Sequence, residues 1–334
     1  MAEHEPEISV VVPVYKGVRF LDESLGSLRR QTFRDWECIC VDDGSRDGSG
    51  AVVDGIAALD NRFRVIRQAN GGTSVARNTA LRAARGRYVA FLDEDDAYEP
   101  RMLETLHAVA VATGADVVGC ELLRMKENDS LRFDGGPVPP ASDWKVADRR
   151  GLAAWMAAMY DEIPYEIWRN LYRRELIVGH YFVPNVRVEQ DLLWHYTLLP
   201  KIGKYVRINW PGYAWRSTAA GGYLNPDAAS LVSLTGTYRL LAEKIAPELG
   251  LNGEERRAFA LKMSQELVVN VWRPLRKGVR LDAESSVRLR QGLRNLYAFD
   301  VDIRRDLDLK KRLKWDVFML TGRTGWIRSW KRRS

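Results

Sequence analysis

The first 125 or so residues constrain the fold of this chain most, because short β-rich runs alternate there with segments of helical spacing. The run from Ile8 to Val14 is rich in β-branched residues and predicts a buried strand, after which Leu21, Leu25 and Leu28 recur at helical spacing. Further strands are expected at 36–41, 63–67, 88–92 and 117–123, and helices at 20–31, 51–59, 73–85 and 100–113. This alternation is typical of βαβ units, so the sequence predicts an α/β fold with a mostly parallel sheet flanked by helices.

Three of the predicted strands end in polar clusters, at residues 13–15, 42–45 and 93–96. Because ligands bind at the carboxyl ends of strands in open α/β sheets, we expect these clusters to meet in one crevice. Four acidic residues in a row at the end of a buried strand repel one another unless a cation lies among them. An aromatic ring, a carboxylate that accepts from a base N–H and a carboxylate pair for a divalent cation together suit a metal-bound nucleoside diphosphate.

The rest of the chain is organised differently. A polar, proline-bearing stretch at 126–143 is expected to be a loop or a lid, and Thr73 is expected to cap the helix that follows Gly71 and Gly72. After Arg216 the pattern is helical only. The expected segments of the second half are a helix at 151–160, an aromatic segment at 165–172, helices at 192–199, 228–245, 254–272 and 284–297, and a basic tail from 310.

Composition excludes several function classes. The formal charge of +7 belongs to the tail, since nine Lys or Arg and one acid, Asp316, lie between residues 310 and 334 and leave about −1 for the rest, which argues against a nucleic-acid-binding groove. No run of about 18 apolar residues occurs and the first seven residues are acidic, so we expect a cytoplasmic protein. Three cysteines and four scattered histidines predict neither a disulfide framework nor a zinc site, so any metal should have oxygen ligands.

The basic tail allows two interpretations. Trp326 and Trp330 lie four residues apart among Lys and Arg, a pattern suited to the interface of an anionic membrane. We therefore expect possible peripheral contact with the inner face of the cell membrane. The alternative is a solvated basic end that folds back on the helical region.

Three runs of the chain resemble the amino-terminal half of glycosyltransferase family 2: ISVVVPVY, ESLGSLRRQTFRDWECICVDDGSRDGS and GGTSVARNTALRAARGRYVAFLDEDD. The resemblance is strong from Glu7 to Pro100, weaker to Ser217 and slight in the last hundred residues. It implies the GT-A fold, a Rossmann-like, mostly parallel sheet flanked by helices, here with a C-terminal helical extension. It also implies a nucleotide-sugar donor, usually a uridine diphosphate (UDP) sugar.

By this resemblance, the donor-binding residues are assigned one by one. Pro13, Tyr15 and Asp43 would contact the nucleobase, with Asp42 beside them, and Arg77 would reach the phosphates or the ribose.

The metal site is assigned in the same way. Asp93, Glu94 and Asp95 match the family's DXD motif, with Asp95 as the first choice for the ligand of Mn²⁺ or Mg²⁺ and Asp96 as the next. The ion would stabilise the charge that grows on the leaving diphosphate.

The catalytic base of the family lies in an acidic dipeptide past the DXD motif. Alignment of the apolar residues that follow places Asp191 in the base position and leaves Gln190 where the family often has Glu. Glu189 is the rival base if the register differs by two residues. Further on, Arg216 lies in a stretch that resembles the family's Tyr-x-x-Arg and could pair with the diphosphate.

The sequence therefore predicts an inverting, metal-dependent glycosyltransferase that uses a saccharide or lipid-linked saccharide acceptor in bacterial cell-surface polysaccharide synthesis. Its expected divisions are 1–125 and 126–217 for the donor and acceptor halves of the GT-A domain, 218–309 for the helical extension and 310–334 for the tail. One alternative is a catalytically inactive nucleotide-sugar-binding protein of the same fold. A Rossmann-type oxidoreductase or a nucleotidyltransferase would need a Gly-x-Gly-x-x-Gly turn after the first strand, and residues 13–19 contain none.

Overall fold

The structure is a computed structural model that describes residues 5–133, 136–152, 166–186, 188–218, 227–299, 302, 312, 315–316 and 318–320. The chain divides into two compact units, each of which is considered by itself. Unit 1 comprises Met1–Arg149, Pro164–Asn185 and Lys201–Ala219, and unit 2 comprises Arg150–Ile163, Val186–Pro200 and Ala220–Ser334. Most of the helix expected at 151–160 lies outside the described residues.

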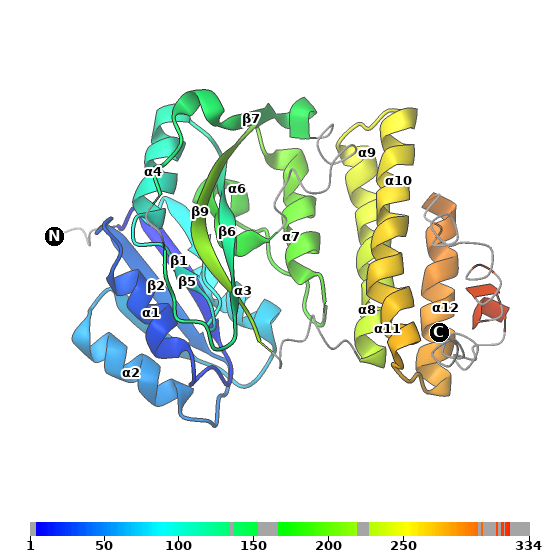
Figure 1. Cartoon of the computed structure of the whole chain (residues 1–334), viewed down its shortest axis with the longest axis horizontal. Helices are drawn as coiled ribbons and strands as arrows, with labels where there is room; N and C mark the ends of the chain where they lie inside the picture. Colours follow the sequence, from blue (N-terminus) through cyan, green and yellow to red (C-terminus); the bar gives the residue numbers. More distant parts are fainter. Residues whose placement is uncertain are drawn as a thin grey trace. The chain divides into compact units, whose positions relative to one another are not determined.

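Unit 1 is built on one mixed sheet (Figure 1). Its strands in the described chain are β1 (Ile8–Val14), β2 (Trp36–Asp42), β3 (Phe63–Arg67), β4 (Tyr88–Phe91), β5 (Ala97–Tyr98), β6 (Val117–Lys126), β7 (Lys145–Asp148), β8 (Asn170–Arg173) and β9 (Lys204–Ser217). They follow the order β3-β2-β1-β4-β8-β6-β9-β5, and β7 pairs with β9. The predicted parallel half, β3-β2-β1-β4, is confirmed.

The central strand β1 explains where the sheet opens. All seven of its residues are buried, as expected for a parallel strand covered on both faces. Its pairing with β4 ends at Val11, whose carbonyl accepts from the Leu92 N–H. The backbone of Pro13, two residues further along β1, faces the same side of the strand as that of Val11. It lies beyond the last residue of β4, so the missing N–H of Pro13 removes no hydrogen bond between the two strands. β1 and β4 therefore part at their carboxyl ends.

Helices cover the sheet of unit 1: α1 (Leu21–Arg29), α2 (Ser49–Leu59), α3 (Thr73–Ala83), α4 (Met102–Thr113) and the short α6 (Arg174–Ile177). The expected cap of α3 was wrong by one residue. Gly72 occupies that position with φ 86° and ψ 163°, a conformation open to glycine, and Thr73 is the first helical residue.

The second half of the sheet contains pairings that the sequence did not predict. The aromatic segment at 165–172 contributes β8, which runs antiparallel to both β4 and β6. Leu171 and Tyr172 are buried there. Four residues are too few for a periodicity signal, so this strand is specified by its neighbours on both sides rather than by its own sequence.

Unit 2 is helical, as predicted. Its described elements are α7 (Gln190–Leu198), α8 (Ala228–Leu240), α9 (Ala246–Glu248), α10 (Gly253–Leu267), α11 (Arg273–Lys277) and α12 (Ala283–Leu296), with π-helical turns η4 (Leu241–Ile245) and η5 (Val268–Trp272). Asp227 and Asp282 cap α8 and α12 by accepting from the N–H groups of Ser230 and Ser285. The two π turns were not predicted.

Part of the tail packs inside unit 2. Trp315 is fully buried, with its ring 5.8 Å from that of Trp272 and 5.4 Å from that of Phe318. Trp326 and Trp330, on which the membrane prediction rests, lie outside the described residues.

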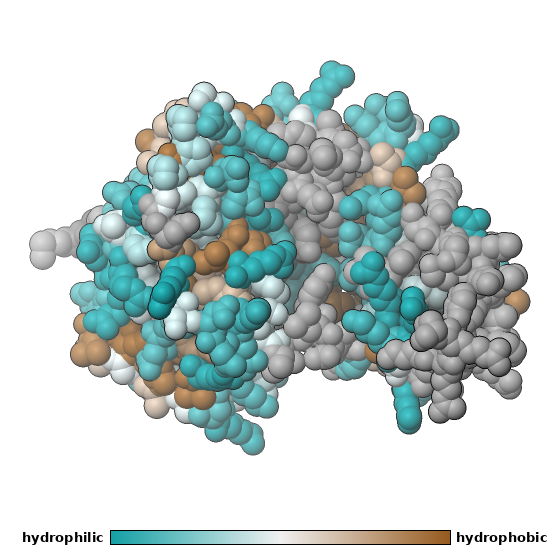
Figure 2. Space-filling model, viewed as in Figure 1, coloured by the Kyte–Doolittle hydropathy of each residue, from teal (hydrophilic) through white to brown (hydrophobic). Residues whose placement is uncertain are grey.

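No helix among the described residues is long and apolar enough to span a membrane. In Figure 2 hydrophobic residues gather over the region of α2, the helix that carries Leu59 with 74% of its surface exposed.

A buried carboxylate ties together the amino ends of the parallel strands. Glu37 is 4% exposed and accepts from the Ser9 hydroxyl at 2.8 Å, the Arg85 backbone N–H at 2.9 Å and the guanidinium groups of Arg64 and Arg85. Burial alone would raise the pKa of Glu37, but the hydrogen bonds from Arg85, Ser9 and Arg64 outweigh it and lower that pKa.

We predict that Glu37→Ala lowers the free energy of unfolding by about 2–4 kcal/mol, because it leaves several buried donors without an acceptor. The pKa is lower in the folded state, so the stabilisation is present above pH 4.5 and is lost as the pH falls through the folded value. Urea unfolding at pH 7 and pH 3.5 measures both effects. The control, Glu175→Ala, removes an exposed acid; a Glu37→Ala loss no larger than this control would contradict the prediction.

Candidate active site

The register of the parallel strands brings the predicted clusters to one edge. Val14 pairs with Asp42 and Asp42 with Arg67, while Val11 pairs with Phe91 on the other side of β1. The loops after β1, β2 and β4 therefore begin at the same edge of unit 1. This edge contains the point where β1 and β4 part, which is where ligands bind in folds of this kind.

The loop after β1 presents Tyr15. This side chain is 41% exposed, whereas Pro13 is buried within the strand. The next residue, Lys16, donates its N–H to the Ser45 hydroxyl at 3.3 Å, so the loops after β1 and β2 are joined. Asp42 accepts from the Ser45 N–H at 2.9 Å, so its side chain stabilises the turn that follows β2.

Asp43 anchors a more distant loop. Its Oδ1 accepts from the Gln68 amide at 2.7 Å and the Gly71 N–H at 2.8 Å, and its Oδ2 accepts from the Gly72 N–H at 2.8 Å. A carboxylate has about four lone-pair positions, so three such bonds leave room for one further donor. The side chain thus holds the loop before α3 at this edge, and one acceptor position stays open to a further donor.

Two of the four acids after β4 are engaged by other residues. Asp93 forms an ion pair with Arg77 of α3, at 2.7 Å, and the Arg77 side chain is only 2% exposed. Asp96 is 2% exposed and accepts from the Tyr213 hydroxyl at 2.8 Å and from the Arg216 N–H at 2.7 Å. Burial, and then repulsion from Asp95 and Asp93, raises the pKa of Asp96.

The other two acids differ in their surroundings. Glu94 packs so closely over Gly17 that a Cβ there would lie 2.5 Å from the Glu94 Cγ. Burial and the charges of Asp95 and Asp93 raise the pKa of Glu94 to about 8. Among the described residues, no other side chain or backbone N–H donates to the Asp95 carboxylate, and burial followed by repulsion from Asp93 raises its pKa to about 6.

The segment that contains Arg77 also contains a residue that sequence reasoning missed. Asn78 is 4% exposed; its amide donates to the Phe182 carbonyl at 2.9 Å and accepts from the Phe182 N–H at 2.8 Å. The Arg77 guanidinium lies 5.3 Å from the centre of the Phe182 ring. Asn78 therefore holds Phe182 in place beside Arg77. In the sequence, its position next to Arg77 in the family motif was the signal that could have identified it.

Arg216 connects three segments of unit 1 through hydrogen bonds of its side chain. Its Nε donates to the Asp95 carbonyl at 3.0 Å, its Nη1 to the carbonyls of Glu127 and Asp129 at 3.1 and 3.2 Å, and its Nη2 to the Glu23 carboxylate at 2.5 Å. The residue is 4% exposed. Most of its donors are thus already used, and a contact with a diphosphate stays a prediction.

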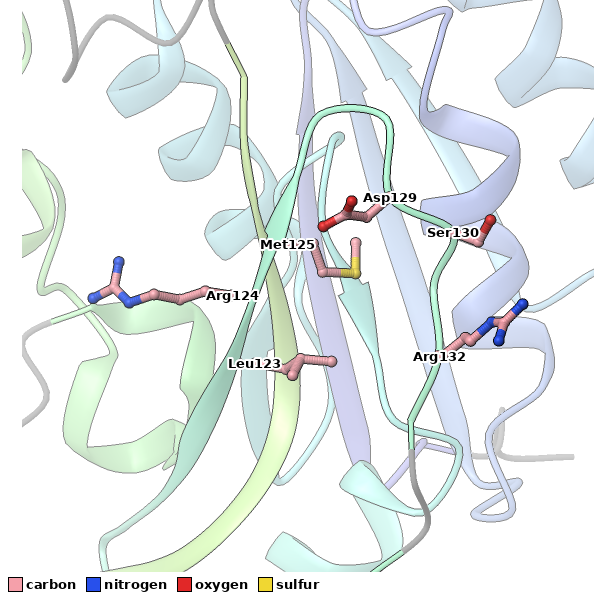
Figure 3. Close-up of a pocket in the computed structure, with 6 residues that line it drawn as sticks. All are labelled: Leu123, Arg124, Met125, Asp129, Ser130 and Arg132. Atoms are coloured by element: carbon pink, nitrogen blue, oxygen red, sulfur yellow. The ribbon is translucent and has the colours of Figure 1, made fainter.

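The turn that Arg216 grips borders a pocket of about 340 Å³. Arg19 holds the same turn from outside through Glu127 and Asn128. The pocket is lined by Leu123, Arg124, Met125, Asp129, Ser130 and Arg132 (Figure 3). In that view Arg124 and Arg132 extend away from each other, so the pocket does not present a paired cationic site.

The candidate bases lie in unit 2. Glu189 occupies the N-cap position of α7 with left-handed φ and ψ of 57° and 30°, and its carbonyl accepts from the Leu193 N–H at 3.0 Å. Asp191 lies in the first turn of the same helix, where the helix dipole favours an ionised carboxylate. His195 is fully buried, which agrees with a packing role.

The described residues contain no group of three or more His, Cys, Asp or Glu side chains that could by themselves hold a metal ion. This does not exclude the predicted ion, because a cation that bridges diphosphate oxygens takes most of its ligands from the substrate. Asp95 is desolvated and accepts from no other residue in the described part of the chain, so its carboxylate has the chemistry of a single protein ligand.

Comparison with known proteins identifies the family. The sequence profile of "Glycosyl transferase family 2" matches residues 9–154. TuaG of Bacillus subtilis, a putative teichuronic acid biosynthesis glycosyltransferase, is 39% identical over 204 residues, which are 60% of this chain and 75% of TuaG. The chain belongs to glycosyltransferase family 2. Another relative, the uncharacterised glycosyltransferase EpsJ of Bacillus subtilis, is 38% identical over 56% of this chain and 54% of its own length.

Solved structures show the GT-A fold of this family 2 chain. Residues 1–349 of Staphylococcus aureus TarS in complex with UDP-GlcNAc superpose with a TM-score of 0.71 at 19% identity, over 96% of this chain and 89% of that one. The mannosyltransferase PcManGT of Pyrobaculum calidifontis, in complex with GDP-Man and Mn²⁺, superposes with a TM-score of 0.51 at 15% identity, over 94% and 88%. The chain spans about half the length of the first curated relatives that it matches.

We predict that Asp95→Asn stabilises the metal-free protein while it harms metal-dependent activity. A carboxyl group whose folded pKa is raised from 3.8 to about 6 makes the folded state less stable as the pH rises between these values. Removing the charge should therefore raise the midpoint of thermal unfolding at pH 7.5, by an amount equivalent to about 1–3 kcal/mol. Calorimetry in chelator measures this. A lower midpoint than wild type would show that the Asp95 charge is stabilised by groups that the structure does not reveal.

Proposed function

We propose that this family 2 glycosyltransferase moves a sugar, with inversion, from a UDP-sugar to a hydroxyl group of a saccharide or lipid-linked saccharide. The observation that carries the proposal is the different surroundings of the four acids after β4. Asp93 and Asp96 are held by other residues and Glu94 packs against the β1 loop, whereas no other residue in the described part of the chain donates to the Asp95 carboxylate. Two similar proteins support the substrate class: TuaG is a putative teichuronic acid biosynthesis glycosyltransferase by its name, and TarS was solved in complex with UDP-GlcNAc.

The donor would lie along the edge where β1 and β4 part. Tyr15 offers an exposed aromatic ring for the base, and the remaining acceptor position of Asp43 suits an N–H of uracil. A bound Mn²⁺ or Mg²⁺ supplies positive charge to the diphosphate oxygens, and Asp95 would hold it with Asp93 and Asp96 nearby. Arg77 would reach the phosphates or the ribose, provided that the donor displaces part of its ion pair with Asp93.

The acceptor hydroxyl must lose its proton as it attacks the anomeric carbon from the face opposite the diphosphate. A carboxylate that accepts this proton typically contributes about 10²- to 10⁴-fold to the rate. Asp191, at the start of α7, is the candidate, with Glu189 as the alternative.

The first experiment measures nucleotide release from a panel of UDP- and GDP-sugars by the purified protein, with Mn²⁺ and with chelator. We expect metal-dependent release from one UDP-sugar. In Asp191→Asn the rate should fall by about 10²- to 10⁴-fold. Glu254→Gln, a change of an exposed acid in the first turn of α10, should leave it unchanged. Nucleotide binding without release from any donor, even with saccharide acceptors present, would favour the inactive binding protein instead.

A second prediction concerns the base-binding ring. We expect Tyr15→Ala to weaken UDP binding by about 5- to 100-fold, because stacking of a base on an aromatic ring is worth roughly 1–3 kcal/mol. The thermal midpoint should hardly change, since Tyr15 is 41% exposed. Tyr181→Ala removes an equally exposed ring, 42%, and serves as the control in calorimetric titrations. Equal UDP affinity in the two variants would remove Tyr15 from the site.

A further inference from the structure

A hydrogen bond between distant side chains links the helical extension to the segment that carries the candidate bases. The Asn270 amide, in the π turn η5, donates to the Glu189 carboxylate with a distance of 3.4 Å between Nδ2 and Oε1. Both residues belong to unit 2. They are 81 positions apart in the sequence, so nothing local to either residue produces the contact.

The surroundings of Asn270 explain why its amide needs a partner. It is half-buried and precedes Val271 and Trp272, which are 0% and 3% exposed, while Leu267 at the end of α10 is 1% exposed. A polar amide on such an apolar helix face is unfavourable unless it is hydrogen-bonded. The π turn is also a rare geometry that recurs at functional sites. The Glu189 carboxylate supplies an acceptor for this amide.

The conformation of Glu189 gives a second, independent observation. Its left-handed φ of 57° is uncommon for a residue with a side chain and costs about 1 kcal/mol, so it persists only where neighbouring contacts hold it. This residue sets the direction in which α7 begins, and Asp191 lies in the first turn that follows. A contact that fixes the Glu189 side chain therefore fixes the start of α7.

We propose that Asn270 is a positioning residue for sugar transfer, which holds Glu189 as an anchor and so places the Asp191 carboxylate. This inference rests on the proposed function. It assigns Glu189 to anchoring and leaves Asp191 as the base. It also makes the helical extension part of the apparatus that orients the base, rather than a separate appendage.

The test compares Asn270→Ala, Asn270→Asp, Glu189→Ala, the double variant Asn270→Ala/Glu189→Ala, and Gln265→Ala in the full chain. Gln265 is an exposed amide on α10 and serves as the matched control. The readouts are kcat and KM for nucleotide release with Mn²⁺ and the donor that wild type uses, and the Kd for UDP.

We expect Asn270→Ala to lower kcat by about 2- to 12-fold, the range for losing one typical intramolecular hydrogen bond, with the UDP Kd within twofold of wild type. Asn270→Asp keeps the shape of the side chain but loses its N–H donor, so kcat should fall at least as far as in Asn270→Ala. In Glu189→Ala, kcat should fall by a similar factor. In the double variant, kcat should fall no further than in the worse single variant, because the two single substitutions remove the same contact.

Three results would overturn the proposal. They are wild-type kcat in Asn270→Ala, wild-type kcat in Asn270→Asp, and a loss of 100-fold or more in Glu189→Ala, which would make Glu189 the base. If wild type releases nucleotide from no donor, the proposed function fails separately. Hydrogen exchange then still tests whether Asn270 holds the start of α7. Asn270→Ala should speed exchange of the amides of residues 190–194 at least tenfold, and Gln265→Ala should not. Unchanged exchange would refute the anchor.

Discussion

Desolvation of the acidic residues that follow β4 governs the arrangement of unit 1. A strand buried on both faces delivers its carboxyl end into a poorly solvated edge, where each ionised side chain needs a compensating partner. Arg77 arrives from α3, and Tyr213 and Arg216 arrive from β9, the last strand of the sheet. The path of the chain around the sheet thus brings hydrogen-bond donors and a positive charge to these carboxylates. Within the described part of the chain Asp95 is the exception, and a carboxylate in these surroundings suits the cation proposed above.

The crevice itself follows from backbone geometry. Pairing between β1 and β4 stops at Val11, and Pro13 leaves the ladder without a donor on that side. Asp43 then gathers the N–H groups of Gly71 and Gly72, which brings the loop before α3 to the same edge. Gly72 tolerates the resulting positive φ because it has no Cβ. Shape at this edge is therefore fixed by main-chain contacts, and the exposed Tyr15 ring lies beside a rigid frame.

Much of this arrangement could be predicted from the sequence, and the remainder could not for identifiable reasons. The run from Ile8 to Val14 and the acids at 93–96 are local patterns, so the parallel strands and the clustering of their polar ends followed from periodicity. The four-residue β8 carries no such pattern. The engagement of Arg216 by Asp95, Glu127, Asp129 and Glu23 depends on tertiary contacts that no spacing reveals. The same holds for Asn270, whose helix reads as an ordinary amphipathic segment until the π turn is seen.

The distance along the chain between Asp96 and its partners affects how the protein is made. Tyr213 and Arg216 follow Asp96 by 117 and 120 positions, and Arg216 follows Glu23 by 193. At about 5–20 residues per second, a ribosome needs roughly 6–24 s to deliver Arg216 after Asp96 has been added. During that interval the nascent sheet carries an acidic edge without its partners, while segments of unit 2 are already being synthesised. Unit 1 is thus a discontinuous domain that completes its folding only when β9 emerges, and the acids after β4 lack their partners from β9 until then.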